Sequence, residues 1–180
     1  MDMARAKYFF FFAFTVLAGS ALLAGSPALA ESGPVTDQQL VQIRARCSEV
    51  QAMLSRVHAN DALLRVNRGQ LYERLSTKLT VPLNSRIVLN RLDGSSLLSV
   101  TSRYEQHLND FRAYYQTYEE QLSATMRINC TKQPAKFYES LQVAREKRQV
   151  VHDSAQQLAK DIGEYKQAFT EFARAYREKK

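Results

Sequence analysis

Residues 127–137, RINCTKQPAKF, place Cys130 just ahead of a helix start that the sequence predicts at Pro134. The chain has only one other cysteine, Cys47 in IRARCSEV (residues 43–50). In an exported chain such a pair predicts a disulfide, because the compartment permits oxidation and two thiols cannot fill a zinc site. A Cys47–Cys130 disulfide would fix how two segments far apart in the sequence lie against each other.

The first 30 residues have the pattern of a secretory signal peptide. Arg5 and Lys7 form a basic start, an apolar run covers residues 9–25, and the small residues up to Ala30 are typical of a cleavage site. The alternative is an uncleaved membrane anchor, because about 17 apolar residues is near the lower limit for a spanning helix. We expect residues 1–30 to be removed, so that the protein meets the membrane only transiently through this segment.

The remaining residues, 31–180, are enough for one domain. A chain of about 150 residues can bury about two thirds of the surface that it exposes when unfolded. The formal net charge of +7 falls to +6 once Asp2, Arg5 and Lys7 are removed. A basic exported protein favours anionic lipids, wall polymers or acidic proteins as partners. The signal peptide argues against an intracellular role on nucleic acids, so no nucleic-acid partner is expected.

Glycine and proline are sparse after residue 31, which predicts few turns. Three long helical segments result, about 36–80, 96–129 and 134–178. The connector covers residues 81–95, where Pro82 is predicted to end the first helix and Asp93–Gly94 to form a turn. A short helix over Ser85–Leu92 within the connector is an alternative. The predicted fold is all-α, an antiparallel three-helix bundle or coiled coil in a single elongated domain.

An apolar repeat of about 3.5 residues defines one contact seam on each segment, as in long helices that pack along their length. The first seam is Leu40, Ile43, Cys47, Val50, Leu54, Val57, Asp61, Leu64, Arg68, Leu71, Leu75 and Lys78. The second is Leu97, Thr101, Tyr104, Leu108, Phe111, Tyr115, Tyr118, Leu122 and Thr125. The third is Phe137, Leu141, Ala144, Arg148, Val151, Ala155, Leu158, Ile162, Tyr165, Phe169, Phe172 and Tyr176.

The cysteine pair also predicts an ion pair. Facing residues of antiparallel helices have numbers that add to a constant, and a Cys47–Cys130 disulfide places Asp61 opposite residue 116. The short turn before Pro134 places Arg148 at the same level. We therefore predict an Asp61–Arg148 ion pair inside the bundle, near the tyrosines of the second helix, which would set the register. The alternative is that both side chains reach solvent.

No catalytic, cofactor or metal site is predicted. The three histidines His58, His107 and His152 fall one on each helix, and the predicted register spreads them over about 18 Å. One metal ion cannot bind all three. The sequence also lacks a phosphate-binding loop and a dinucleotide fingerprint.

Three sequence segments resemble known proteins: YERLSTKL (72–79), LDGSSLLSV (92–100) and INCTKQPAKFYESLQVAREKRQVV (128–151). In this order they resemble a set of uncharacterised exported helical proteins of candidate-phylum bacteria. The resemblance covers about residues 45–160 and implies three helices and an envelope or secreted location. No activity is known for that set, so it implies no functional residue.

Two classes of function fit these observations. The first is a non-enzymatic structural or interaction protein of the cell envelope or surface, exported to the periplasm, the cell surface or the medium. It would present a helical face to a protein or to an anionic envelope partner, and the sequence is compatible with an oligomer. The second is an extracytoplasmic holdase-type chaperone. An enzyme ranks third, because three filled seams leave no obvious pocket.

Overall fold

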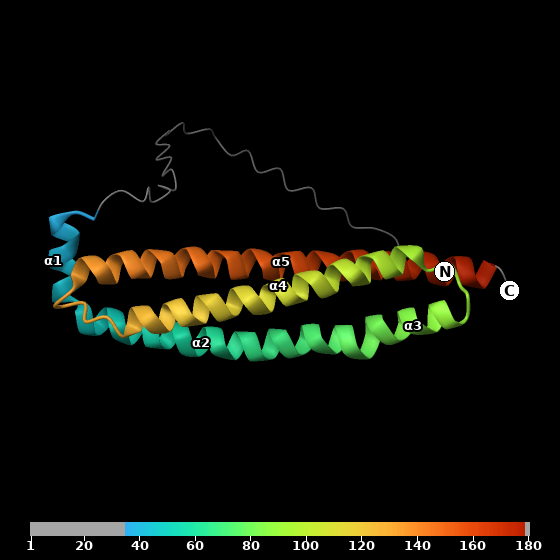
Figure 1. Cartoon of the computed structure of the whole chain (residues 1–180), viewed down its shortest axis with the longest axis horizontal. Coiled ribbons are helices and arrows are strands. Elements are labelled where there is room, and N and C mark those ends of the chain that lie inside the picture. Colours follow the sequence, from blue (N-terminus) through green and yellow to red (C-terminus); the bar gives the residue numbers. More distant parts are fainter. Residues whose placement is uncertain (1–34, 179–180) are drawn as a thin grey trace, which may run out of the picture. The chain divides into compact units, whose positions relative to one another are not determined.

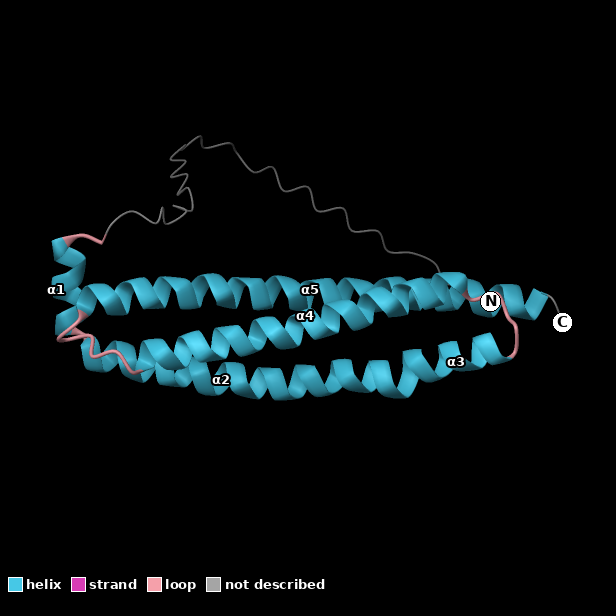
Figure 2. Ribbon diagram, in the orientation of Figure 1, coloured by secondary structure: helices cyan, strands magenta, loops and turns pink. Residues whose placement is uncertain are grey.

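The computed structural model describes residues 35–178, and every element in this range is a helix (Figure 2). The prediction of an all-α protein is therefore confirmed for this part of the chain. The elements are α1 (Asp37–Ala45), α2 (Cys47–Arg74), a π-helical segment η1 (Leu75–Thr80), α3 (Val81–Leu89), α4 (Ser95–Met126) and α5 (Pro134–Glu178). The predicted signal peptide, residues 1–30, lies outside the described residues.

Helix α4 packs against both α2 and α5, and it lies between these two helices in the middle of Figure 1. The start of α2 is joined to the loop after α4 by the Cys47–Cys130 disulfide. The end of α2 reaches the middle of α4, where the rings of Tyr72 and Phe111 meet edge to face with centroids 5.6 Å apart. Contacts at both ends therefore show that α2 and α4 run in opposite directions.

The predicted seam of the central helix is confirmed. The nine buried residues of α4 are the nine seam residues, from Leu97 to Thr125. An unbroken seam fits a helix that has neighbours on both sides, because each turn must then bury an apolar or aromatic side chain. Tyr118 and Leu122 of this seam pack with Leu54 of α2 and Phe137 of α5 in one core cluster.

The first predicted helix, 36–80, differs from the structure at both ends. It is divided at Arg46, where the backbone leaves the helical region with φ −110° and ψ 19°. The prediction that Pro82 ends the helix is wrong, because the chain continues as α3 to Leu89. The π-helical segment precedes Pro82 and ends with a bond from Val81 N–H to Ser76 O. Pro82 thus lies in the first turn of α3, where a missing N–H is tolerated.

The predicted connector, 81–95, is therefore mostly helix, and the reversal occupies residues 90–94. Arg91 adopts a positive φ of 53°. Its N–H donates to Val88 O, and the Leu92 N–H donates to Ile87 O, each at 3.0 Å. This pair of bonds is the Schellman arrangement, which satisfies the last carbonyls of a helix. Gly94 then lies so close to Ile87 that a Cβ would approach its Cγ2 to 2.5 Å.

The other predicted boundaries are close to those observed. The second helix was expected over 96–129 and ends at Met126, whereas α5 covers the predicted range 134–178. Asn129 Oδ1 accepts hydrogen bonds from the N–H groups of Thr131 and Lys132, at 3.1 and 2.9 Å. This side chain shapes the loop that carries Cys130 and leads into Pro134.

Candidate functional site

The structure joins the two predicted cysteines. Cys47 is the first residue of α2, Cys130 lies in the loop between α4 and α5, and their Cα atoms are 5.5 Å apart. Cys130 is fully buried in the core cluster that contains Leu54 and Phe137. The disulfide therefore ties α2 to the point where α4 turns into α5.

Asp61 and Arg148 also meet, on α2 and α5. Arg148 Nε donates to Asp61 Oδ2 at 2.7 Å, and Arg148 Nη2 donates to Asp61 Oδ1 at 2.9 Å. This is a two-bond contact of the kind that guanidinium groups form with carboxylates. The burial differs from the prediction, since the Asp61 side chain is 11% exposed but that of Arg148 is 56% exposed. The arginine reaches solvent and the carboxylate does not.

Tyr118 of α4 completes this contact by donating to Asp61 Oδ2 at 2.6 Å. Burial raises the pKa of Asp61, but the hydrogen bonds from Arg148 and Tyr118 outweigh it and hold that pKa below its usual value. Burial and the bond to Asp61 raise the pKa of the Tyr118 hydroxyl. The carboxylate of Asp61 is thus an ionised acceptor held by α4 and α5.

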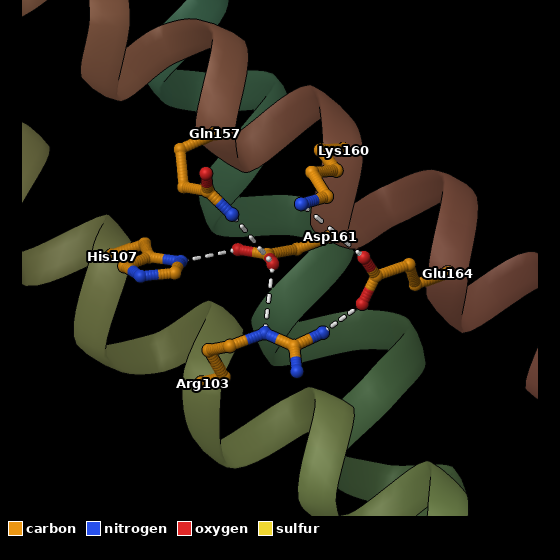
Figure 3. Close-up of polar contacts among 6 residues, drawn as sticks. All are labelled: Arg103, His107, Gln157, Lys160, Asp161 and Glu164. Atoms are coloured by element: carbon orange, nitrogen blue, oxygen red, sulfur yellow. Dashed lines mark hydrogen bonds and ion pairs between the residues drawn. The ribbon is translucent and has the colours of Figure 1, made fainter.

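A second buried carboxylate, Asp161 of α5, was missed by the sequence analysis (Figure 3). Its side chain is 0% exposed. Arg103 Nε donates to Oδ1 at 3.1 Å, His107 Nδ1 lies 2.6 Å from Oδ2, and Gln157 Nε2 donates to Oδ1 at 3.4 Å. Arg103 also contacts Glu164 on the outside of this cluster. The predicted register could have found the contact, because it places residue 103 opposite residue 161.

The three histidines lie in separate contacts, in agreement with the predicted spacing. His58 Nε2 is 2.5 Å from Glu119 Oε1, and His152 Nε2 is 2.8 Å from Gln156 Nε2. His107 belongs to the Asp161 cluster. Between residues 35 and 178, no group of three or more His, Cys, Asp or Glu side chains is placed to hold a metal ion.

A groove runs between α2 and α5, with α4 as its floor, and α1 lines one end of it. It consists of two hollows of about 470 and 710 Å³ that share Tyr118, Arg145 and Arg148. The α4 floor includes Phe111, Tyr115, Tyr118 and Leu122. None of the Asp161 cluster lines either hollow. The Asp61–Arg148 ion pair joins the two walls where the hollows meet, and Asp61 is bound there to Tyr118 of the floor.

The charge along this groove is strongly one-sided. Five arginines line it: Arg46, Arg65, Arg68, Arg145 and Arg148. Asp61 is the only acidic residue among the lining side chains, and it is already paired. The guanidinium of Arg65 lies over the ring of Tyr115, 5.0 Å from its centroid. We call this feature the arginine groove.

No protein-family model, curated protein or solved structure matches the chain. Among the helices between residues 35 and 178, none combines the length and the apolar character that a bilayer crossing requires. The geometry of the chain itself therefore carries the functional argument.

Proposed function

We propose that this chain is a non-enzymatic exported interaction protein of the cell envelope or cell surface. In it, α2, α4 and α5 act as an antiparallel three-helix bundle that offers one face to a protein partner. The observation that carries the proposal is the exposed apolar surface of α2. Leu64 and Leu71 belong to its predicted contact seam, yet they are 55% and 48% exposed. A seam that the other described residues leave uncovered is typical of a binding surface.

Two further observations support this proposal. The disulfide suits an oxidising compartment and an N-terminal segment with the pattern of a signal peptide. The partly buried carboxylate of Asp61 and the fully buried one of Asp161 bind side chains of neighbouring helices, so these charged groups serve to hold helices together. An arrangement of this kind supports a rigid scaffold more readily than a reaction centre.

The test is photocrosslinking in living cells. A photoreactive residue at position 71 on the exposed seam should capture one defined protein in the envelope or medium fraction. The same residue at Ser154, which is partly buried on α5, is the control and should capture little. Capture of many unrelated proteins, or recovery of the chain from the cytoplasm with residues 1–30 intact, would contradict the proposal.

A holdase-type chaperone is the second candidate, and the same exposed apolar residues favour it. Such a chaperone would bind unfolded exported proteins through apolar contact and general positive charge. It should therefore suppress aggregation of an unfolded outer-membrane protein at a one-to-one ratio. A dedicated interaction protein should leave that aggregation unchanged at the same ratio.

A further inference from the structure

The arginine groove has apolar walls that the other residues between 35 and 178 leave half open. Met53 and Leu64 of α2 both line it and are 51% and 55% exposed. Opposite them, Leu141 and Val151 of α5 line the same groove and are only partly buried. Covering such side chains with another apolar surface would stabilise a complex.

The shape of the groove matches a helix. Its α2 wall extends from Val50 to Tyr72, which corresponds to about 33 Å at the usual helical rise. Its floor is a row of aromatic and aliphatic side chains of α4, from Phe111 to Leu122, which are nearly buried, so a ligand would contact mainly the walls. An amphipathic helix fits such a site by laying its apolar face into the groove.

The positive charge of the groove favours a helix with acidic residues on both sides of its apolar stripe. Five arginines and one paired aspartate leave a surplus of positive charge along the whole length. Arg68 of α2 and Arg145 of α5 are both exposed and stand on opposite walls. Carboxylates on both sides of an apolar stripe could form charge-assisted bonds with these guanidinium groups.

We propose that the arginine groove binds an amphipathic helix of a partner protein whose apolar stripe is flanked by Asp and Glu residues. This rests on the proposed function and narrows it to one surface and one partner chemistry. A second copy of the chain is a poorer occupant, because with a net charge of +7, or +6 without residues 1–30, it brings no surplus of negative charge to the groove.

The test measures binding of designed peptides to the purified full-length chain by fluorescence anisotropy. The probe is a peptide of about 28 residues, long enough to span the groove, with leucines at the a and d positions and glutamates at the flanking e and g positions. One control peptide has lysines in place of the glutamates, and another has the same composition in scrambled order. The glutamate peptide should bind at least tenfold tighter than either control, and salt should weaken its binding.

Paired variants locate the binding site. Leu64→Gln, inside the groove, should weaken binding about fivefold, because half of a leucine surface would lose its apolar contact. Leu63→Gln changes the exposed neighbouring side chain, which does not line the groove, and should leave binding unchanged. The charge-reversed pair Arg68→Glu and Arg145→Glu should abolish detectable binding of the glutamate peptide. Arg56→Glu with Arg174→Glu, equal in charge but outside the groove, should not.

The inference would be overturned if the glutamate peptide did not bind, or if all three peptides bound equally well. Equal effects of the groove variants and their controls would also overturn it. So would anionic lipid vesicles that bind the protein and compete with the peptide. A dimer in sedimentation velocity that Leu64→Gln dissociates would assign the groove to a second copy and would overturn it too. These measurements use purified protein, so their outcome does not depend on whether the chain is exported. A partner captured in cells through another face would leave the proposed function standing.

Discussion

The hydroxyl of Tyr118 donates a 2.6 Å hydrogen bond to the Asp61 carboxylate, which links the floor of the arginine groove to its α2 wall. The same carboxylate accepts two bonds from Arg148, so α2, α4 and α5 meet at one buried acceptor. The carboxylate is enclosed and the guanidinium is largely in water. Loss of its partner should therefore cost more free energy for the Asp61 carboxylate than for the Arg148 guanidinium.

Replacement of Arg148 should cost more stability than neutralisation of Asp61. Arg148→Met keeps much of the stem but leaves the enclosed carboxylate with only Tyr118 as a partner, so we expect a loss of about 1–2 kcal/mol. Asp61→Asn leaves Arg148 free to hydrate and should cost about half as much. Urea unfolding of both variants and of the double variant measures the coupling. Additive losses would show that the ion pair contributes nothing.

Acid should weaken this contact in a defined direction. The pKa of Asp61 is lower in the folded protein than in the unfolded chain, despite its burial, because of Arg148 and Tyr118. Its contribution to stability is thus present above the unfolded pKa, about 3.9, and is lost as the pH falls through the folded pKa. The stability difference between the wild type and Asp61→Asn should shrink over this range. A difference that does not change with pH would contradict the assignment.

The disulfide should be the largest single contribution to stability. It closes a loop with a sequence separation of 83 residues, which corresponds to about 4–5 kcal/mol in the chain-entropy model. The double variant Cys47→Ser and Cys130→Ser should show a matching loss in chemical unfolding. A reducing agent should destabilise the wild type and leave the double variant unchanged. Equal sensitivity of both proteins would show that the agent acts elsewhere.

The sequence predicted the buried seam of α4 in full and that of α2 only in part, for one physical reason. An apolar repeat shows which side chains avoid water, but it does not show what covers them. On α4 every seam residue has a neighbour in the same chain. On α2 the repeat includes Leu64 and Leu71, which the described residues leave about half exposed. That difference between pattern and burial is the basis of the proposed interaction with a partner.

Two local features lay beyond the rules applied to the sequence. The rule that proline ends a helix failed at Pro82, because a π-helical segment shifts the hydrogen bonds just before it. Asp161 was missed because it lies one position before the seam residue Ile162, among other charged residues of α5, and only the register relates it to Arg103 and His107. Charged residues one position from a seam should therefore be checked against the facing helix.

Arg91→Gly should stabilise the protein. Arg91 ends α3 in the left-handed region, with φ 53°, at the position of a Schellman cap that glycine normally occupies. Relief of that strain outweighs the greater freedom of glycine in the unfolded chain, so we expect a gain of about 0.5–1 kcal/mol. Thermal unfolding of Arg91→Gly and of Arg91→Ala separates loss of the side chain from the backbone effect. A gain of equal size in Arg91→Ala would contradict it.

Two buried tyrosines should respond in opposite directions to loss of their hydroxyl groups. Tyr104 Oη donates to Tyr72 O at 2.9 Å, whereas Tyr165 Oη is buried without a hydrogen-bond partner among the described residues. Tyr165→Phe removes an unsatisfied polar atom and should raise the free energy of unfolding by about 1 kcal/mol. Tyr104→Phe leaves a carbonyl without its donor and should lower it by about the same amount. Both variants keep the ring and its packing, so urea unfolding compares the two hydroxyl groups directly. A loss of stability in Tyr165→Phe equal to that in Tyr104→Phe would show that the Tyr165 hydroxyl has a partner after all.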